Sequence, residues 1–204
     1  MKDLEFLAAL HQLVRPPRYL EIGVGDGERL ALARRRAIGV APTSRYDVKN
    51  GVRLYRQPPE AYFARKHPLR HFEGRPPVLT LIAPGQDGLR WFAAAEPLMR
   101  WHGVVVMDGA TGFDPGDRVV VPVATEPALV VVLGLLPKGE RAGPGPVHEK
   151  RLAPGAVLDS SLWRIVRNAR SQRAQRDQGV AELHAAYRRD LAGLSGFVRR
   201  LRRA

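Results

Sequence analysis

Three glycines at alternating positions are the part of the sequence best suited to chemistry. Gly23, Gly25 and Gly27 directly follow the apolar segment 19–22. Glycine lets the backbone approach a ligand closely, and a helix that begins after such a turn offers free amide groups. The spacing predicts a small-molecule site, with an ordinary strand-to-helix turn as the alternative. It departs from the dinucleotide-binding fingerprint, which needs a glycine where this chain has Glu28.

Alternating strand and helix patterns surround this turn. Continuous apolar runs predict strands over residues 19–22, 37–41, 52–55, 78–82, 103–107, 118–123 and 128–136. Helical spacing and end signals predict helices over residues 3–14, 28–36, 59–65 and 89–100. Strands that are apolar on both faces call for a parallel sheet covered by helices on both sides. The last two strands have no helix-length segment between them, so we expect an antiparallel pair at one edge.

Composition divides the 204 residues into four segments. An N-terminal helix over 1–16 precedes an α/β domain over 17–136. A Pro- and Gly-rich linker is predicted over 137–158 and an Arg-rich helical segment over 159–204. The net charge is +13, and residues 163–204 alone carry 11 arginines against three acids. The positive charge is therefore concentrated in the last segment.

Several classes of protein are excluded by what the sequence lacks. With no cysteine, the chain has neither disulfides nor thiolate chemistry. Its first residues lack the basic start and long apolar run of a secretory signal. No apolar run approaches the roughly 18 residues that span a bilayer. We therefore expect a soluble, cytoplasmic protein.

The stretch YLEIGVGDG over 19–27 resembles motif I of the class I S-adenosylmethionine-dependent methyltransferases, an acid followed by three alternating glycines. Residues 53–65 and 79–110 are similar to segments of a bacterial branch linked to sugar and natural-product O-methylation. The resemblance covers residues 17–136. It implies a Rossmann-like sheet of seven strands in the order 3-2-1-4-5-7-6, mostly parallel with one antiparallel edge strand, and S-adenosylmethionine as the cofactor.

The resemblance also implies which residues hold this cofactor. The acid and the glycines of motif I hold its methionine end, a role that falls to Glu21, Gly23, Gly25 and Gly27. Asp26 lies among them, although a turn or helix-start role is the alternative for it and for Glu28. Positions at the ends of the next strands complete the predicted cofactor-binding set: Ala41, Thr43, Gln57 and Ala83.

The sequence departs from the family at two of these strand ends. The second strand normally ends in an acid that grips both ribose hydroxyls, and here Ala41 stands there. Its loss is expected to weaken binding by about 1–3 kcal/mol unless the following loop, through residues such as Thr43 or Ser44, replaces it. The fourth strand normally supplies an acid and a histidine, and here it supplies Ala83 and Gln86.

Asp108, at the end of the fifth predicted strand, is the candidate catalytic residue. Alignment supplies much of the rate of methyl transfer, but an O-methyltransferase also needs a group that accepts the proton. Asp87 and His102 are the other candidates near this position, and a plain strand-end acid is the alternative for Asp108. One carboxylate does not make a magnesium site, so we predict no metal.

The predicted function is methyl transfer from S-adenosylmethionine to a small-molecule or sugar hydroxyl. The alternative is a catalytically degenerate protein of this fold that serves as a binding or scaffold subunit. A third reading, an RNA methyltransferase, lacks the family's Asn-Pro-Pro-Tyr or Asp-Pro-Pro-Tyr motif.

The Arg-rich C-terminal segment has two interpretations. Its arginines recur every three residues from Arg164 to Arg176, so they wind around the helix instead of forming one stripe. Further on, apolar residues from Leu191 to Leu201 form one face flanked by arginines. The favoured interpretation is capping or homodimerisation through these helices. Binding to a membrane surface, an acidic glycan or RNA is the other.

Overall fold

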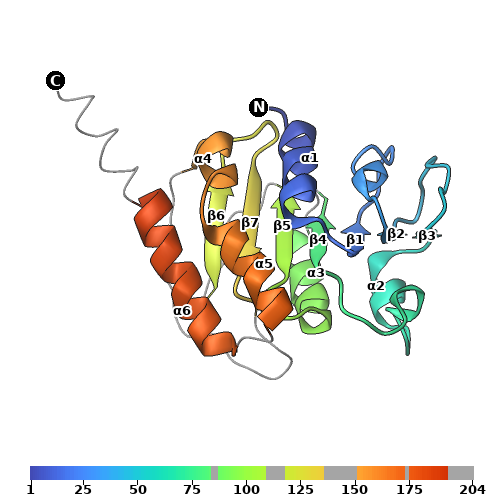
Figure 1. Cartoon of the computed structure of the whole chain (residues 1–204). Coiled ribbons are helices and arrows are strands. Elements are labelled where there is room, and N and C mark those ends of the chain that lie inside the picture. The colour runs from blue at the N-terminus through green and yellow to red at the C-terminus, as the bar shows by residue number, and fades with distance from the viewer. Residues whose placement is uncertain (84–86, 109–117, 136–150, 173–174, 193–204) are drawn as a thin grey trace.

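The computed structural model describes residues 1–83, 87–108, 118–135, 151–172 and 175–192 (Figure 1). One seven-stranded sheet forms the centre, in the order β3-β2-β1-β4-β5-β7-β6, which confirms the predicted order. Each strand is a short, largely buried run, as the apolar pattern predicts. The strands are β1 (Arg18–Ile22), β2 (Arg36–Val40), β3 (Val52–Tyr55), β4 (Leu79–Ile82), β5 (Val104–Asp108), β6 (Val119–Val123) and β7 (Leu129–Leu133).

One strand of the sheet is antiparallel to the others. β1 to β5 pair parallel with one another, whereas β7 pairs antiparallel with both β5 and β6. The reversed strand is therefore β7, one position in from the edge. The carboxyl ends of β1, β4, β5 and β6 consequently meet at the same edge of the sheet, where ligands bind in sheets of this kind.

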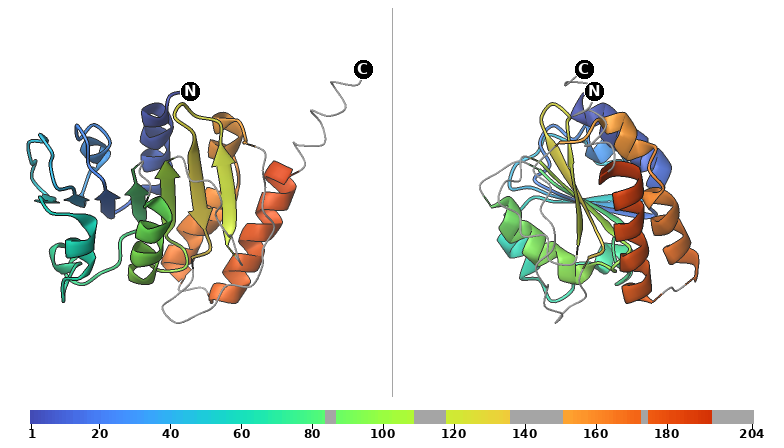
Figure 2. Two further views of the ribbon diagram at one scale, coloured as in Figure 1. Left: turned by 180° about the vertical axis from the view of Figure 1, so that it is seen from behind. Right: turned by 90° about the vertical axis from the view of Figure 1, so that its left-hand side faces the viewer.

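Helices cover both faces of the sheet, as predicted (Figure 2). α1 (Asp3–Val14), α4 (Pro154–Leu158), α5 (Leu162–Gln172) and α6 (Arg176–Tyr187) cover one face and enclose the largest apolar cluster. α2 (Pro59–Phe63) and α3 (Gly88–Ala95) cover the other face. Short helical turns complete the chain: η1 (Leu30–Leu32), η2 (Arg70–Phe72), η3 (Glu96–Leu98) and the π-helical η4 (Arg188–Ala192).

The helix predicted over 28–36 is wrong. Only the single turn η1 forms there, and Arg36 already belongs to β2. To begin β2 in parallel register, the chain must return the four strand rises from Ile22 to the level of Arg18, about 13 Å, in addition to the length of the glycine turn. Eight residues remain after the glycine turn, and as a helix they would span only about 12 Å. The crossover is therefore built from turns and bends around η1, with Leu30 buried against Gly39.

The last part of the predicted linker is also not loop. Residues 154–158 form α4, which buries Val157 against the sheet face. Just before it, Leu152 bridges to Val123 at the end of β6. Pro154 stands in the first turn of α4, the one helical position where a missing amide costs nothing, so its presence did not exclude a helix.

Some expectations concern residues outside the described ranges. Gln86, residues 136–150 of the linker region and the apolar face beyond residue 192 are among them. Within the described part of the chain, no helix is both long and apolar enough to cross a bilayer.

Candidate functional site

A pocket lies at the carboxyl ends of β1 and β4, against the glycine turn. Its volume is about 400 Å³, within the range of about 300–1,000 Å³ typical of small-molecule sites. Five of the predicted binding residues line it: Glu21, Gly23, Gly25, Asp26 and Ala83. The other lining residues are Asp3, Leu4, Glu28, Arg29 and Pro127.

The first two glycines shape the floor of this pocket. Gly23 has a φ of 86°, and a Cβ added to it would lie 3.0 Å from the Cβ of Ala83. A side chain at position 23 would therefore meet both backbone strain and a close neighbour. Gly25 differs, because a Cβ added there would meet nothing within 4 Å. A side chain at position 25, which lines the pocket, would therefore meet open space.

Gly27 serves packing in this structure. Its φ is 92°, and an added Cβ would lie 2.1 Å from the ring of Tyr46. The Ser44 hydroxyl donates a hydrogen bond to the carbonyl of Gly25 (3.2 Å), and the amide of Tyr46 donates one to the Ser44 oxygen (3.2 Å). The loop after β2 is thus closed onto the glycine turn, and Gly27 does not line the pocket.

Glu21 is a carboxyl group buried beneath the pocket. Only 1% of the residue is exposed, and its Oε2 accepts a hydrogen bond from the Tyr19 hydroxyl (2.9 Å). Burial raises the pKa of Glu21 to about 7, although the Tyr19 hydrogen bond and the Arg29 charge both act to lower it. Glu21 therefore changes charge near neutral pH, and a cation in the pocket would favour its ionised form.

Arg29 joins three elements at the wall of the pocket. Its Nη2 pairs with Asp3 of α1 and lies 3.1 Å from Oδ2 of Asp108 at the end of β5. The Asp108 side chain is only 2% exposed and lies outside the pocket lining, so it reaches the pocket through Arg29. The predicted catalytic acid is therefore part of an ion-pair network that fixes Arg29 and the start of α1.

The charge of the pocket opposes that of the chain. Among the described residues, four acids line it, Asp3, Glu21, Asp26 and Glu28, against one cation, Arg29, whereas the whole chain carries +13. Asp26 also accepts a hydrogen bond from the amide of Glu28 (3.0 Å), the turn role that the sequence left open. This balance favours a small ligand that carries positive charge and disfavours a nucleic acid.

The remaining predicted cofactor residues lie along the neighbouring strand ends instead of in the pocket. Ala41 is buried at the end of β2, and Thr43 is exposed on the following loop. Gln57 follows β3, where its Oε1 accepts a weak hydrogen bond from Arg65 (3.4 Å) and its buried Nε2 has no partner among the described residues.

Sequence reasoning missed Asp3, Leu4, Arg29 and Pro127. Asp3 stands 18 positions before Glu21, and Pro127 belongs to the turn between β6 and β7. Their proximity depends on α1 meeting that turn, where the amide of Asp3 donates to the carbonyl of Glu126 (3.3 Å). No local sequence pattern signals these contacts.

A second pocket adjoins the first at the same edge. It has a volume of about 530 Å³ and shares Pro127 with the glycine-turn pocket. Its lining also includes Lys2, Thr125 and Arg151. The Oγ1 of Thr125 is buried and has no hydrogen-bond partner among the described residues. A polar ligand in this pocket could complete that bond.

The other catalytic candidates are not among the residues that line the glycine-turn pocket. His102 is half-buried in the turn before β5, at the edge of the sheet opposite the glycine turn, so its position does not support the catalytic role considered for it. Asp87 is exposed at the start of α3. Within the described ranges, no group of three or more His, Asp or Glu side chains is arranged to hold a metal ion.

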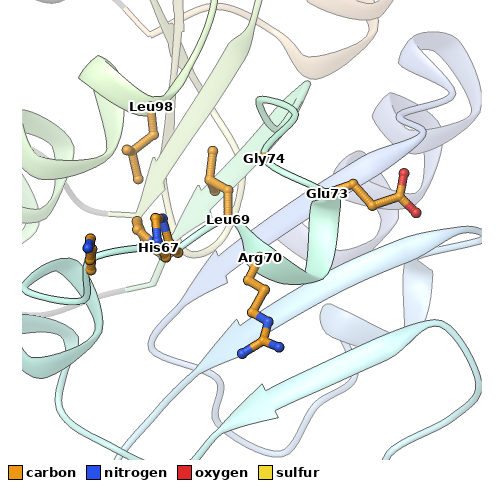
Figure 3. Close-up of a pocket in the computed structure, with 8 residues that line it drawn as sticks. His67, Leu69, Arg70, Glu73, Gly74 and Leu98 are labelled. Atoms are coloured by element: carbon orange, nitrogen blue, oxygen red, sulfur yellow. The ribbon is translucent and has the colours of Figure 1, made fainter.

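A further hollow lies between η2 and η3 (Figure 3). Its volume is about 370 Å³, and Leu69, His67 and Leu98 face it. The charged ends of Arg70 and Glu73 point away from it in Figure 3. None of these residues comes from the glycine-turn edge, so this apolar hollow is separate from the candidate site.

The architecture was compared with known proteins. No protein-family model and no curated protein matches the sequence. A protein from Staphylococcus aureus, assigned as a caffeoyl-CoA O-methyltransferase, superposes on 64% of this chain and 82% of its own, with a TM-score of 0.51 and 13% identity. The chain has the class I methyltransferase fold.

Two further solved structures are similar at lower scores. An O-methyltransferase family protein from Burkholderia thailandensis matches 67% of this chain and 56% of its own, with a TM-score of 0.46 and 13% identity. A protein from Klebsiella pneumoniae, assigned as an O-methyltransferase, matches 65% and 80%, with a TM-score of 0.47 and 12% identity. The similarity to the Staphylococcus aureus protein, at 13% identity, concerns the fold alone.

Proposed function

We propose that this protein is an S-adenosylmethionine-dependent methyltransferase that acts on the hydroxyl group of a small molecule or sugar. The observation that carries the proposal is the acid-rich pocket against the glycine turn of a strongly basic chain. S-adenosylmethionine is a small molecule with a sulfonium and an ammonium cation, so it matches both the size and the charge of this pocket. Ligands of doubly wound sheets bind at this same edge, where the strand order reverses between β1 and β4.

The residues present fit this cofactor at its methionine end. The ionised Glu21 carboxylate, with Asp26 beside it, would hold the ammonium group, and the open backbone at Gly25 would allow close approach. Arg29 is the cation in the lining that can pair with a ligand carboxylate. When bound, the cofactor supplies an activated methyl group on sulfur.

Asp108 is proposed to act through Arg29. Its side chain is buried behind the guanidinium and holds it at the wall of the pocket. That Asp108 accepts a proton directly stays a prediction, and the ion pair with Arg29 supports a positioning role.

The adjoining pocket is the proposed place for the acceptor. It opens beside the cofactor pocket at Pro127, and the unpartnered Oγ1 of Thr125 can bond a hydroxyl or ether oxygen. Lys2 and Arg151 outnumber Glu126, the acid among the described lining residues, which would suit an acceptor with negative charge. A small-molecule acceptor fits these dimensions better than a macromolecule.

A degenerate, non-catalytic protein is the second candidate function. Two observations favour it: Ala41 in place of the ribose-binding acid, and the closure of the loop after β2 onto Gly25 and Gly27 through Ser44 and Tyr46. Binding of the adenosine end would require this loop to make new contacts with the ribose. The two functions are separated by whether the cofactor binds at all.

Calorimetric titration with S-adenosylmethionine tests the proposal, with Gly25→Arg as the blocking variant. The new side chain would fill the pocket without backbone strain, because Gly25 has an ordinary φ and open space around it. Gly155→Arg is the matched control, since Gly155 is also exposed and unobstructed but lies in α4. We expect binding in the wild type and in Gly155→Arg and none in Gly25→Arg. Absence of binding in the wild type would favour the degenerate protein.

A further inference from the structure

A large basic pocket lies at the amino-terminal edge of the sheet, opposite the glycine turn. Its volume is about 660 Å³. It forms where the end of α1, the segment before β1, the segment before β2 and α5 come together. The residues that line it are His11, Gln12, Arg15, Pro16, Pro17, Arg34, Arg35 and Arg170.

Among the described residues, the lining contains four guanidinium groups and no acid. Arg15, Arg34 and Arg35 are exposed, and none of them forms an ion pair with an acid in the described part of the chain. Arg170 is held in place by donating a hydrogen bond to the carbonyl of Val14 (2.8 Å), which leaves its other nitrogens available. The four guanidinium groups therefore place positive charge around one pocket, and no acid among its described lining residues compensates it.

Further arginines add to the repulsion in this region. Burial, followed by the charges of Arg167 and Arg18, lowers the pKa of Arg170. The pKa of Arg18 is also lowered, first by burial and then by the charges of Arg75, Arg100 and Arg36. An arginine cluster of this kind destabilises the folded chain unless an anion compensates it.

His11 contributes an uncharged polar group. It is buried, and its ring contacts the ring of Tyr19 edge-on, with the centroids 4.7 Å apart. Burial and then the charge of Arg34 lower the pKa of His11 to about 4. At neutral pH the imidazole of His11 is therefore neutral.

We propose that this pocket binds the diphosphate group of a small ligand. Guanidinium groups are planar forks that match phosphate oxygens in pairs. A carboxylate carries one charge and neutralises one guanidinium, whereas two linked phosphates carry several charges and several acceptor oxygens. A diphosphate therefore suits a lining with four guanidinium groups better than a carboxylate does. Free pyrophosphate and nucleoside diphosphates share this chemistry.

The shape of the pocket favours a small ligand over RNA. Within the described part of the chain, its apolar lining is Pro16 and Pro17, and its one aromatic ring, that of His11, already packs on Tyr19. Single-stranded nucleic acid binds where aromatic faces are free for its bases to stack. This site is independent of the methyl transfer proposed above, because it lies at the other edge of the sheet and shares no lining residue with the glycine-turn pocket.

The test is calorimetric titration of the full chain with pyrophosphate, ADP and a single-stranded RNA oligonucleotide at low ionic strength. We expect one pyrophosphate per chain, and a loss of affinity of at least about tenfold in Arg34→Gln/Arg35→Gln, because two charged hydrogen-bonding groups are removed. Equal affinity for ADP and pyrophosphate would identify the diphosphate alone as the ligand, and tighter ADP binding would identify a nucleotide; both support the site.

Two further variants serve as controls for the binding experiment. Arg53→Gln/Arg188→Gln removes the same charge from two exposed positions outside the pocket and should bind pyrophosphate like the wild type. Arg15→Gly removes a guanidinium at a φ of 45°, where glycine fits the backbone better, so weaker binding there cannot come from misfolding. The proposal would be overturned if the wild type bound no pyrophosphate or bound RNA alone. It would also be overturned if the Arg53/Arg188 variant lost as much affinity for pyrophosphate as the Arg34/Arg35 variant.

Discussion

Replacing Glu21 by glutamine should stabilise the protein at alkaline pH and leave it nearly unchanged in acid. The rise in the pKa of Glu21 from its ordinary value of 4.5 to about 7 corresponds to about 3 kcal/mol, at about 1.4 kcal/mol per tenfold change in the protonation constant. Glutamine keeps an oxygen for the Tyr19 hydroxyl and carries no charge that burial would penalise. The variant therefore lacks the cost that ionised Glu21 imposes on the folded state.

The direction in which stability changes with pH follows from whether the folded or the unfolded chain holds the proton of Glu21. Below the unfolded pKa of 4.5 the carboxyl is neutral in both states, so burial costs nothing. As the pH rises from 4.5 to about 7, the unfolded chain ionises while the folded chain keeps the proton, and stability is lost until Glu21 itself ionises. Between about pH 5 and pH 8, the wild type should lose about 2–3 kcal/mol through this group, and Glu21→Gln should not.

Urea unfolding of both proteins at these two pH values measures the difference. Glu28→Gln is the control, because Glu28 lines the same pocket with an exposed side chain, so this variant removes a carboxylate that is not buried. A free energy of unfolding for Glu21→Gln that follows the wild type at both pH values would refute the reasoning, since Glu21 would then carry no cost of burial.

Two other predictions concern the neighbours of Glu21 and Arg29. Tyr19→Phe removes a hydrogen bond that lowers the pKa of Glu21, so the midpoint of the pH dependence of stability should move upward; an unchanged midpoint would show that the hydrogen bond does not act on the carboxylate. Asp108→Asn weakens the buried partner of Arg29 and should destabilise the fold by about 1–3 kcal/mol in urea, while also weakening S-adenosylmethionine binding. Full binding with full loss of activity would instead assign Asp108 to proton transfer.

The strands and their order could be predicted because burial leaves a continuous apolar signal and because the resemblance supplied the topology. The crossover after the glycine turn could not, since its conformation depends on the distance that the chain must return in register with β1. Local apolar spacing favoured a helix there, whereas the parallel pairing of β1 with β2 required a longer, more extended path.

The candidate site was predicted in part for a similar reason. Motif I identified Glu21, Gly23 and Gly25, whose positions follow from a single strand and turn. The network of Arg29 with Asp3 and Asp108 joins residues 26 and 79 positions apart, so only the assembled fold reveals it. The basic pocket could not be predicted for the same reason. The sequence places Arg34 and Arg35 at the end of a predicted helix and Arg170 in the Arg-rich C-terminal segment, with no sign that the three lie together.

Titration of the wild-type protein with S-adenosylmethionine at about pH 6 and about pH 8 tests the central claim, that the acid-rich pocket at the glycine turn holds this cationic cofactor. If only the ionised form of Glu21, whose pKa is about 7, binds the cofactor, the affinity should rise about tenfold between these pH values. Folded protein that binds no S-adenosylmethionine at millimolar concentration at either pH would contradict the account.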